Sequence, residues 1–161
     1  MSMIGNLLMI SNGQLQQLIG EPSLVEDYIY AERKEDKFLN LDKSWHAIHF
    51  ILNGNNYEGQ GPLAMVFFGG EEIGEDHGYG PVRYLTTDQV KQVSLSLSEI
   101  SHENFSQKYD PQAMDAASIY PNVWERDSAE GLKYIVPFFQ DLKKFYNEAA
   151  LRDQAVLIYI N

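Results

Sequence analysis

The sequence contains no cysteine and few basic residues. The absence of cysteine excludes disulfides, thiolate nucleophiles and cysteine-based zinc sites. Of the 161 residues, 12 are Lys or Arg and 23 are Asp or Glu, so the formal net charge is −11. Because nucleic acids and anionic membrane surfaces are bound through Lys and Arg, this charge argues against both kinds of partner. It favours a basic protein partner, which an acidic surface attracts.

Long hydrophobic runs are missing as well. The longest uninterrupted apolar runs cover six residues each, at 63–68 and 155–160, whereas a membrane-spanning helix needs about 20. No cationic start leads into an apolar stretch, so we see no signal-peptide pattern. Since 44% of the residues are hydrophobic, the chain has the composition of a globular protein. We expect one cytoplasmic bacterial domain over residues 1–161.

The pattern of apolar residues and helix caps predicts an α+β fold, with several helices packed on a small sheet of about three strands. The expected strands are residues 3–10, 82–85 and 155–160, and their pairing direction stays open. Helices are expected at residues 14–19, 42–53 and 63–68, after the capping box of Thr86 and Gln89, after Ser101, after Asp110, and from Asp127 onward. Pro137 is expected to kink or restart the last helix. The charged run at residues 32–37 predicts a solvated helix end or a loop.

The expected helix at residues 42–53 carries the most informative polar pattern. At about 100° per residue, one face of this helix collects four polar residues. They are Asp42, His46, His49 and Asn53. Trp45 flanks this face, and most of the remaining residues are apolar, with Gly54 just past the end. A helix that is apolar around most of its circumference is normally buried, so the polar face lies in the interior or along a cleft.

Three roles are open for His46 and His49. Both can be structural residues bonded to carbonyls or carboxylates, since an unpaired buried polar group costs about 1–3 kcal/mol. Both can also line a cleft as ligand contacts or acid/base groups, because an unperturbed imidazole titrates near neutral pH. A shared metal ion is the third role, but strong helical metal motifs add a Glu at a fixed offset, and Ala47 and Ile48 separate the histidines here. We therefore predict no metal site and no cofactor.

Residues 69–81 form a predicted loop with five glycines and four acids. Neither glycine-rich nucleotide motif is present, the carboxylates would repel a phosphate, and the spacing does not fit a calcium loop. Long loops in compact domains usually have a function, so this is a partner-binding loop or a solvated connector. Arg83 follows the loop and either pins it through a bidentate carboxylate pair or binds an anion. The candidate site residues in and after the loop are Glu71, Glu72, Asp76, His77, Arg83 and Tyr84.

Several blocks of the sequence resemble the YfbM-like family of bacterial proteins. These blocks are residues 3–5, residues 41–46 with Gly54, residues 69–74, residues 80–85 and residues 119–121. The resemblance covers nearly the whole chain, and it implies one domain with an α/β-type fold and no assigned activity. In the pattern of the family, the most weight falls on Asp42, Trp45, Tyr84 and Tyr120. The resemblance also brings the expectation of an immunity-like role, as the partner of a toxin.

Two functions remain as hypotheses. The first is a non-catalytic binding protein that holds a basic partner with the acidic loop and a cleft lined by His and Trp side chains. The alternative is a small hydrolase in which His46 or His49 is the acid/base group, Glu72 or Asp76 supports it, and Arg83 holds the substrate. No complete motif of a serine hydrolase is present. The first hypothesis is therefore favoured.

Overall fold

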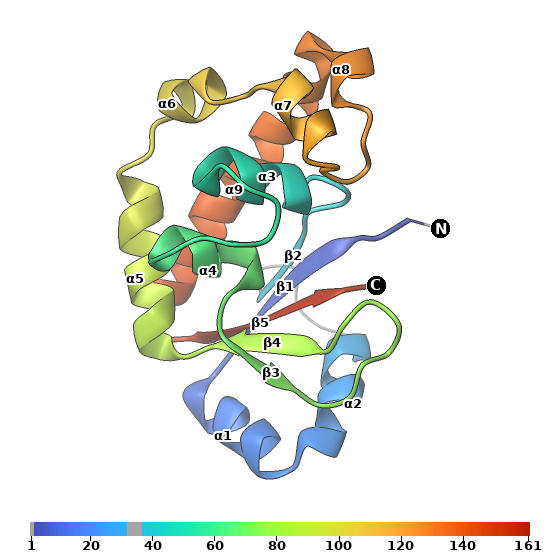
Figure 1. Ribbon diagram of the computed structural model, residues 1–161. Helices are drawn as coiled ribbons and strands as arrows, with labels where there is room; N and C mark the ends of the chain where they lie inside the picture. The colour runs from blue at the N-terminus through green and yellow to red at the C-terminus, as the bar shows by residue number, and fades with distance from the viewer. Residues whose placement is uncertain (1, 32–36) are drawn as a thin grey trace.

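One antiparallel sheet forms the centre of the fold in the computed structural model, which describes residues 2–31 and 37–161. Its strands are β1 (Gly5–Ile10), β2 (Phe38–Asn40), β3 (Glu71–Ile73), β4 (Val82–Leu85) and β5 (Ala155–Ile160). They lie in the order β2-β1-β5-β4-β3, and each strand is antiparallel to its neighbours. The two ends of the chain therefore pair with each other near the middle of the sheet (Figure 1).

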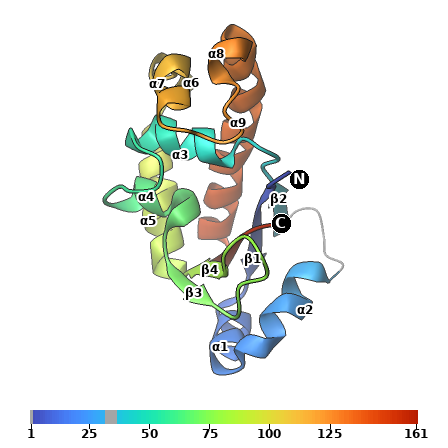
Figure 2. The same ribbon diagram turned by 45° about the vertical axis from the view of Figure 1, so that its right-hand side comes forward.

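Helices cover both faces of this sheet (Figures 1 and 2). On one face lie α1 (Asn12–Gly20), the 3-10 helix η1 (Pro22–Leu24) and α2 (Val25–Tyr30). On the other face lie α3 (Trp45–Asn53), α4 (Pro62–Phe68), α5 (Thr87–Ser98) and α9 (Ala129–Leu151). At the end of α9 that is remote from the sheet lie α6 (His102–Gln107), α7 (Pro111–Ala116) and α8 (Trp124–Asp127). None of the helices in the described ranges is long and apolar enough to cross a membrane.

The two helical layers explain why the central strands are apolar at nearly every position. In β1, Leu7 packs into the core beside α3 and α9, whereas Leu8 packs into the core beside α1 and α2. In β5, Ile158 and Leu157 divide between the same two cores. Successive side chains of a strand point to opposite faces, so a sheet that is covered on both faces needs apolar residues on both. The predicted buried strand at residues 155–160 is confirmed, with Ile160 at its end only partly buried.

Local capping signals correctly placed the starts of α5, α6 and α7 and the end of α3. The exception is Asp127, which ends α8 and does not begin the last helix, since α9 starts at Ala129. The Thr86 side chain accepts the Gln89 N–H and the Gln89 side chain accepts the Thr86 N–H, which is the predicted capping box. Ser101 and Asp110 cap α6 and α7 in the same way from the side chain. Gly54 ends α3 in the left-handed conformation, with φ of 78°. These signals depend on residues within one turn of each helix end.

The structure corrects three of the predictions. The described sheet has five strands instead of about three, because the edge strands β2 and β3 have three residues each, too few for a recognisable strand pattern. Asp42 does not cap a helix, since α3 begins at Trp45 and the Asp42 carboxylate instead accepts the Tyr134 hydroxyl. Helix α9 runs without a break through Pro137, so it does not restart there. Of the charged run at residues 32–37, only Lys37 lies among the described residues.

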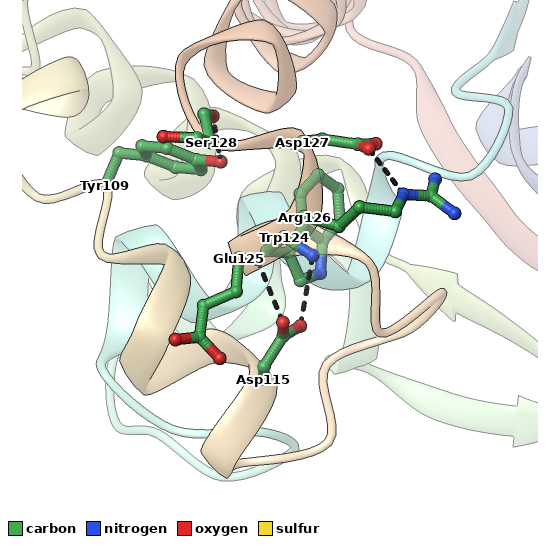
Figure 3. A network of polar contacts seen from close by, with 7 residues as sticks. All are labelled: Tyr109, Asp115, Trp124, Glu125, Arg126, Asp127 and Ser128. Carbon is green, nitrogen blue, oxygen red and sulfur yellow. Dashed lines mark hydrogen bonds and ion pairs between the residues drawn. The ribbon is translucent and has the colours of Figure 1, made fainter.

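The connection between α7 and α8 carries Tyr120, and polar contacts hold both of its ends (Figure 3). The two carboxylate oxygens of Asp115 accept the backbone N–H groups of Trp124 and Glu125, at 3.1 Å and 2.9 Å. The buried Trp124 indole N–H donates to the carbonyl of Ile119 at 2.9 Å. These bonds satisfy two free amides at the start of α8 and hold the connection that carries Tyr120 against α7 and α8.

Candidate binding site

Helix α3 forms the floor of the candidate site. Seven of its residues are buried, and Trp45, His46 and His49 are only 3%, 1% and 1% exposed. The polar face that the sequence predicts for this helix points at the connection from α3 to α4, residues 54–61. His46 and His49 contact the carbonyls of Asn56 and Glu58 in this connection, and the Asn53 amide donates to the carbonyl of Leu63 in α4 at 3.0 Å. The helix therefore uses its polar side chains to hold the chain that follows it.

His46 uses both of its ring nitrogens in bonds to the main chain. Its Nδ1 accepts the backbone N–H of Tyr120 at 2.9 Å, and its Nε2 lies 2.8 Å from the carbonyl oxygen of Asn56. Because a backbone N–H can only donate, Nδ1 is unprotonated, and Nε2 carries the proton that it donates to Asn56. Burial lowers the pKa of His46, the bond to Asn56 raises it in part, and the nearby His49 lowers it again. The ring is a neutral link between two loops.

His49 holds the same connection one turn further along α3. Its Nε2 lies 3.1 Å from the carbonyl oxygen of Glu58, and its Nδ1 lies 3.3 Å from the Asn53 amide nitrogen. Burial is the largest influence on this ring too, and it lowers the pKa of His49. Of the three roles open to the histidines, these contacts are those of structural residues bonded to carbonyls. No group of three or more His, Asp or Glu residues within the described ranges is arranged to hold a metal ion.

Four aromatic rings, two of them on α3, are stacked pairwise, and we call them the aromatic stack: Tyr57, His46, Trp45 and Tyr120. The ring of Tyr57 lies on that of His46, with centroids 4.9 Å apart and an angle of 29° between the planes. His46 lies on Trp45 at 5.0 Å and 11°, and Trp45 lies on Tyr120 at 5.7 Å and 22°. Phe68 stands edge-on against Tyr57 at 5.4 Å and 67°. Stacked and edge-on pairs are the favourable geometries for aromatic rings, so the stack is a rigid wall.

A hollow of about 400 Å³ lies along the aromatic stack, and we call it the aromatic hollow. It is lined by Met3, Trp45, His46, Tyr57, Phe68, Tyr79, Ser118, Tyr120, Pro121, Asn122 and Ile160. These residues come from the N-terminus, α3, the α3–α4 connection, α4, the β3–β4 turn, the α7–α8 connection and β5. Trp45 also donates its indole N–H to the carbonyl of Met3 at 2.9 Å. The hollow is thus built by segments that are distant in sequence.

The acidic segment predicted as one loop is partly a strand. Glu71 and Glu72 lie in β3, opposite Tyr84 and Arg83 of β4. Glu72 accepts one bond from Arg83 Nη2 at 3.0 Å, so the predicted bidentate pair is not formed. The Tyr84 hydroxyl donates to Glu71 at 2.8 Å, and this bond is the main cause that raises the pKa of Tyr84. Arg83 and Tyr84 therefore tie the acidic edge strand to the sheet.

The turn between β3 and β4 carries the other acidic residues. Asp76 Oδ1 accepts the backbone N–H groups of Gly78 and Gly80, at 2.7 Å and 3.0 Å, which closes the turn. His77 is exposed, with Nε2 at 3.9 Å from a carboxylate oxygen of Glu26 on α2. That contact lies beside another hollow, lined by Glu75 and α2 residues. His77 therefore faces away from the aromatic stack.

The acidic segment and the aromatic hollow meet at Tyr79. A second hollow, of about 280 Å³, is lined by Glu72, Arg83 and Tyr79 together with residues of β5, and we call it the Arg83 hollow. It shares Tyr57, Phe68, Tyr79 and Ile160 with the aromatic hollow. A larger hollow, of about 770 Å³, also reaches Tyr57 and Phe68 and continues along residues 58–61. Tyr57, which is 59% exposed, therefore borders all three hollows.

The structure brings only part of the predicted site together. Trp45 and His46 line the aromatic hollow, and Glu72 and Arg83 line the adjoining one. The remaining predicted residues line neither: Asp42, His49, Glu71, Asp76, His77 and Tyr84. Asp42 lies instead beside Tyr134, and burial together with the Asp42 carboxylate raises the pKa of that tyrosine.

Sequence reasoning missed three aromatic residues of the site. They are Tyr57, Phe68 and Tyr79. One feature of the sequence could have indicated two of them: Tyr57 and Tyr79 are large aromatic residues in segments that otherwise consist mainly of Gly, Asn and acidic residues. An aromatic residue in such a segment usually packs against another part of the protein or binds a ligand.

Comparison with known proteins gives a family and a fold. The sequence profile of a family described as "Domain of unknown function (DUF1877)" matches residues 1–159. Among solved structures, the chain is similar to the crystal structure of YfbM from Escherichia coli, a protein of unknown function. That match has a TM-score of 0.79 and 20% sequence identity, and it covers 98% of this chain and 99% of the other. No curated protein matches the chain.

Proposed function

The chain belongs to the YfbM-like family, the domain of unknown function DUF1877, and from its site we propose that it is a non-catalytic binding protein for a basic partner. The proposal includes a cytoplasmic location for the protein. An immunity-like role, in which the basic partner is a toxin, is one form that it takes. The observation that carries it is the proximity of an acidic edge strand to the aromatic hollow: Glu72 of β3 lines the Arg83 hollow, which shares Tyr57 and Tyr79 with the aromatic hollow.

The charge distribution supports a basic partner. Glu71, Glu72, Glu75 and Asp76 are all exposed along β3 and the turn that follows it. Arg83 pairs with Glu72, but Glu75 forms no ion pair with any residue of the described ranges. On a protein with a net charge of −11, such a cluster attracts cationic surfaces and increases their rate of association. The attraction weakens as salt is added.

The composition of the hollow supports binding rather than a merely solvated surface. Tyrosine and tryptophan are enriched in the central residues of protein interfaces, because they offer a large contact area with few rotatable bonds. Trp45, Tyr57, Tyr79 and Tyr120 all border the aromatic hollow. Trp45 and Tyr120 are held in place by bonds to the main chain of Met3. A partner would therefore meet a preorganised surface, which reduces the entropy that binding must overcome.

The hydrolase alternative receives no comparable support. A general base needs a free nitrogen within reach of the substrate proton. Both nitrogens of His46 are engaged by main-chain groups, and His49 donates to Glu58 while its second nitrogen faces Asn53. Burial also lowers the pKa of both rings. The geometry gives these histidines a structural task.

The experiment that tests this proposal compares two variants with the same change in charge. The first replaces the four loop acids by their amides, Glu71→Gln, Glu72→Gln, Glu75→Gln and Asp76→Asn. The amides at positions 71, 72 and 76 keep an oxygen that can accept the bonds of Tyr84, of Arg83, and of Gly78 and Gly80. The control neutralises four exposed acids elsewhere, Asp88→Asn, Glu99→Gln, Glu103→Gln and Asp141→Asn.

Capture from native lysate, with identification and quantification of the retained proteins, is the measurement. We expect the wild type and the control variant to retain a basic protein at low salt, and both to release it as the salt concentration rises. The loop variant is expected to lose that protein. Equal capture by the loop variant, or retention that ignores salt, contradicts the proposal.

A further inference from the structure

We propose that the aromatic hollow receives an arginine side chain of the basic partner, with the guanidinium group stacked on Tyr57. This inference rests on the proposed function and adds the chemistry of the contact. It is carried by three observations: the open end of the aromatic stack, the charges around the hollow, and the polar groups at its rim.

The aromatic stack ends in an exposed ring. Tyr57 lies on His46 with one of its faces and is nevertheless 59% exposed. Phe68 stands edge-on beside it, so this neighbour does not cover the ring face. A planar group that lies on the open face of Tyr57 would extend the series of near-parallel rings by one member. The guanidinium group of arginine is planar and stacks on aromatic faces in this manner.

The charges around the hollow favour a cation. No Lys or Arg lines the aromatic hollow among the residues that the structure describes. Arg83 lines the adjoining hollow, where Glu72 neutralises it at 3.0 Å. His46, the titratable ring in the wall, is in its neutral form because Nδ1 accepts a backbone N–H. A cation near the face of an aromatic ring is attracted to it, and Arg83, the cation of the adjoining hollow, is paired with Glu72.

The rim of the hollow suits a guanidinium better than an ammonium group. No carboxylate lines the aromatic hollow within the described ranges, so a strongly hydrated lysine ammonium would lose water without gaining an ion pair. A guanidinium is more weakly hydrated and presents its donors in the plane of the group. Ser118 and Asn122 line the hollow and are exposed. Their side-chain oxygens are neutral hydrogen-bond acceptors at the rim of the hollow.

The test is an NMR titration of the full chain with short peptides at low salt. The probes are acetyl-Gly-Arg-Gly-amide, the same peptide with Lys, and the same peptide with citrulline, which has the shape of arginine without its charge. The variants are Tyr57→Ala and the matched control Tyr30→Ala, because both tyrosines are 59% exposed and Tyr30 lies on α2. The readouts are the backbone signals and the indole N–H signal of Trp45.

We expect the arginine peptide to cause saturable shifts at His46, Tyr57, Tyr120 and the Trp45 indole, with weaker binding of the lysine peptide and none of the citrulline peptide. Tyr57→Ala is expected to weaken binding at least about threefold, in line with a cation–π contact at an exposed site. Tyr30→Ala is expected to leave the affinity unchanged. The inference is overturned by shifts that do not saturate, by equal binding of the lysine or citrulline peptide, or by equal losses in the two variants.

This result and the result for the proposed function are read separately. Lysate capture compares variants of the acidic segment, whereas the titration compares variants of the aromatic stack. Salt-sensitive capture with no saturable arginine shifts leaves the proposed function standing and overturns the arginine contact. Saturable arginine binding without capture of a basic protein supports the arginine contact and contradicts the proposed function.

Discussion

Replacing His46 by phenylalanine tests whether the buried imidazole holds the candidate site together. Phenylalanine keeps a ring between Trp45 and Tyr57, but it removes the donor to the Asn56 carbonyl and the acceptor of the Tyr120 N–H. A buried polar group that loses its partner costs about 1–3 kcal/mol. Two groups are affected, and water can reach one of them because Asn56 is exposed. We therefore expect the free energy of unfolding to fall by about 2–4 kcal/mol.

Urea denaturation, followed by circular dichroism, measures this loss. The control is His102→Phe, which makes the same substitution at an exposed histidine at the start of α6. It is expected to change the free energy of unfolding by no more than about 0.5 kcal/mol. Hydrogen exchange of the Tyr120 amide gives a local readout, because this proton loses its acceptor in His46→Phe and is expected to exchange faster. The reasoning is refuted if the two variants are equally stable or if exchange at Tyr120 is unchanged.

Three further predictions concern pH and the backbone. The pKa values of His46 and His49 are lowered from 6.5 in the folded protein, so the unfolded chain takes up protons first as the pH falls. We expect the contribution of these rings to the free energy of unfolding to be fully present above about pH 7 and to decrease as the pH drops below 6.5. Equal urea midpoints at pH 7.5 and 5.5 would contradict this. In thermal unfolding, Gly70→Ala is expected to destabilise the protein by more than about 2 kcal/mol, because φ is +79° and the new Cβ would lie 1.9 Å from a carbonyl oxygen of β4. Gly20→Ala, where a Cβ meets nothing within 4 Å, is expected to be close to neutral in the same assay. Asp115→Ala removes the acceptor of two amides at the start of α8 and is expected to cost about 1–2 kcal/mol in urea denaturation, with a smaller loss for Asp115→Asn, which keeps one acceptor oxygen.

The sequence by itself determined the features that depend on neighbouring residues. The α+β class, the strands β1, β4 and β5 and the caps at Thr86 and Gly54 were all predicted from short segments. An apolar run, a capping side chain and a left-handed glycine act within a few positions along the chain, so they can be recognised without knowledge of the fold. Trp45 and His46 were found in this way, because the helix that carries them has a clear polar face.

Only the tertiary structure decided what that polar face contacts. His46 is 74 residues away from Tyr120 in the sequence, yet Nδ1 accepts the Tyr120 amide, and this bond makes the ring a structural link. Tyr57 and Tyr79 reach the same hollow from two different connections, and the edge strands β2 and β3 exist because longer strands offer them partners. Such contacts join segments whose separation along the chain says nothing about their distance in space. The composition of the site therefore follows from the packing of α3, α4 and the two chain ends, and no local pattern encodes it.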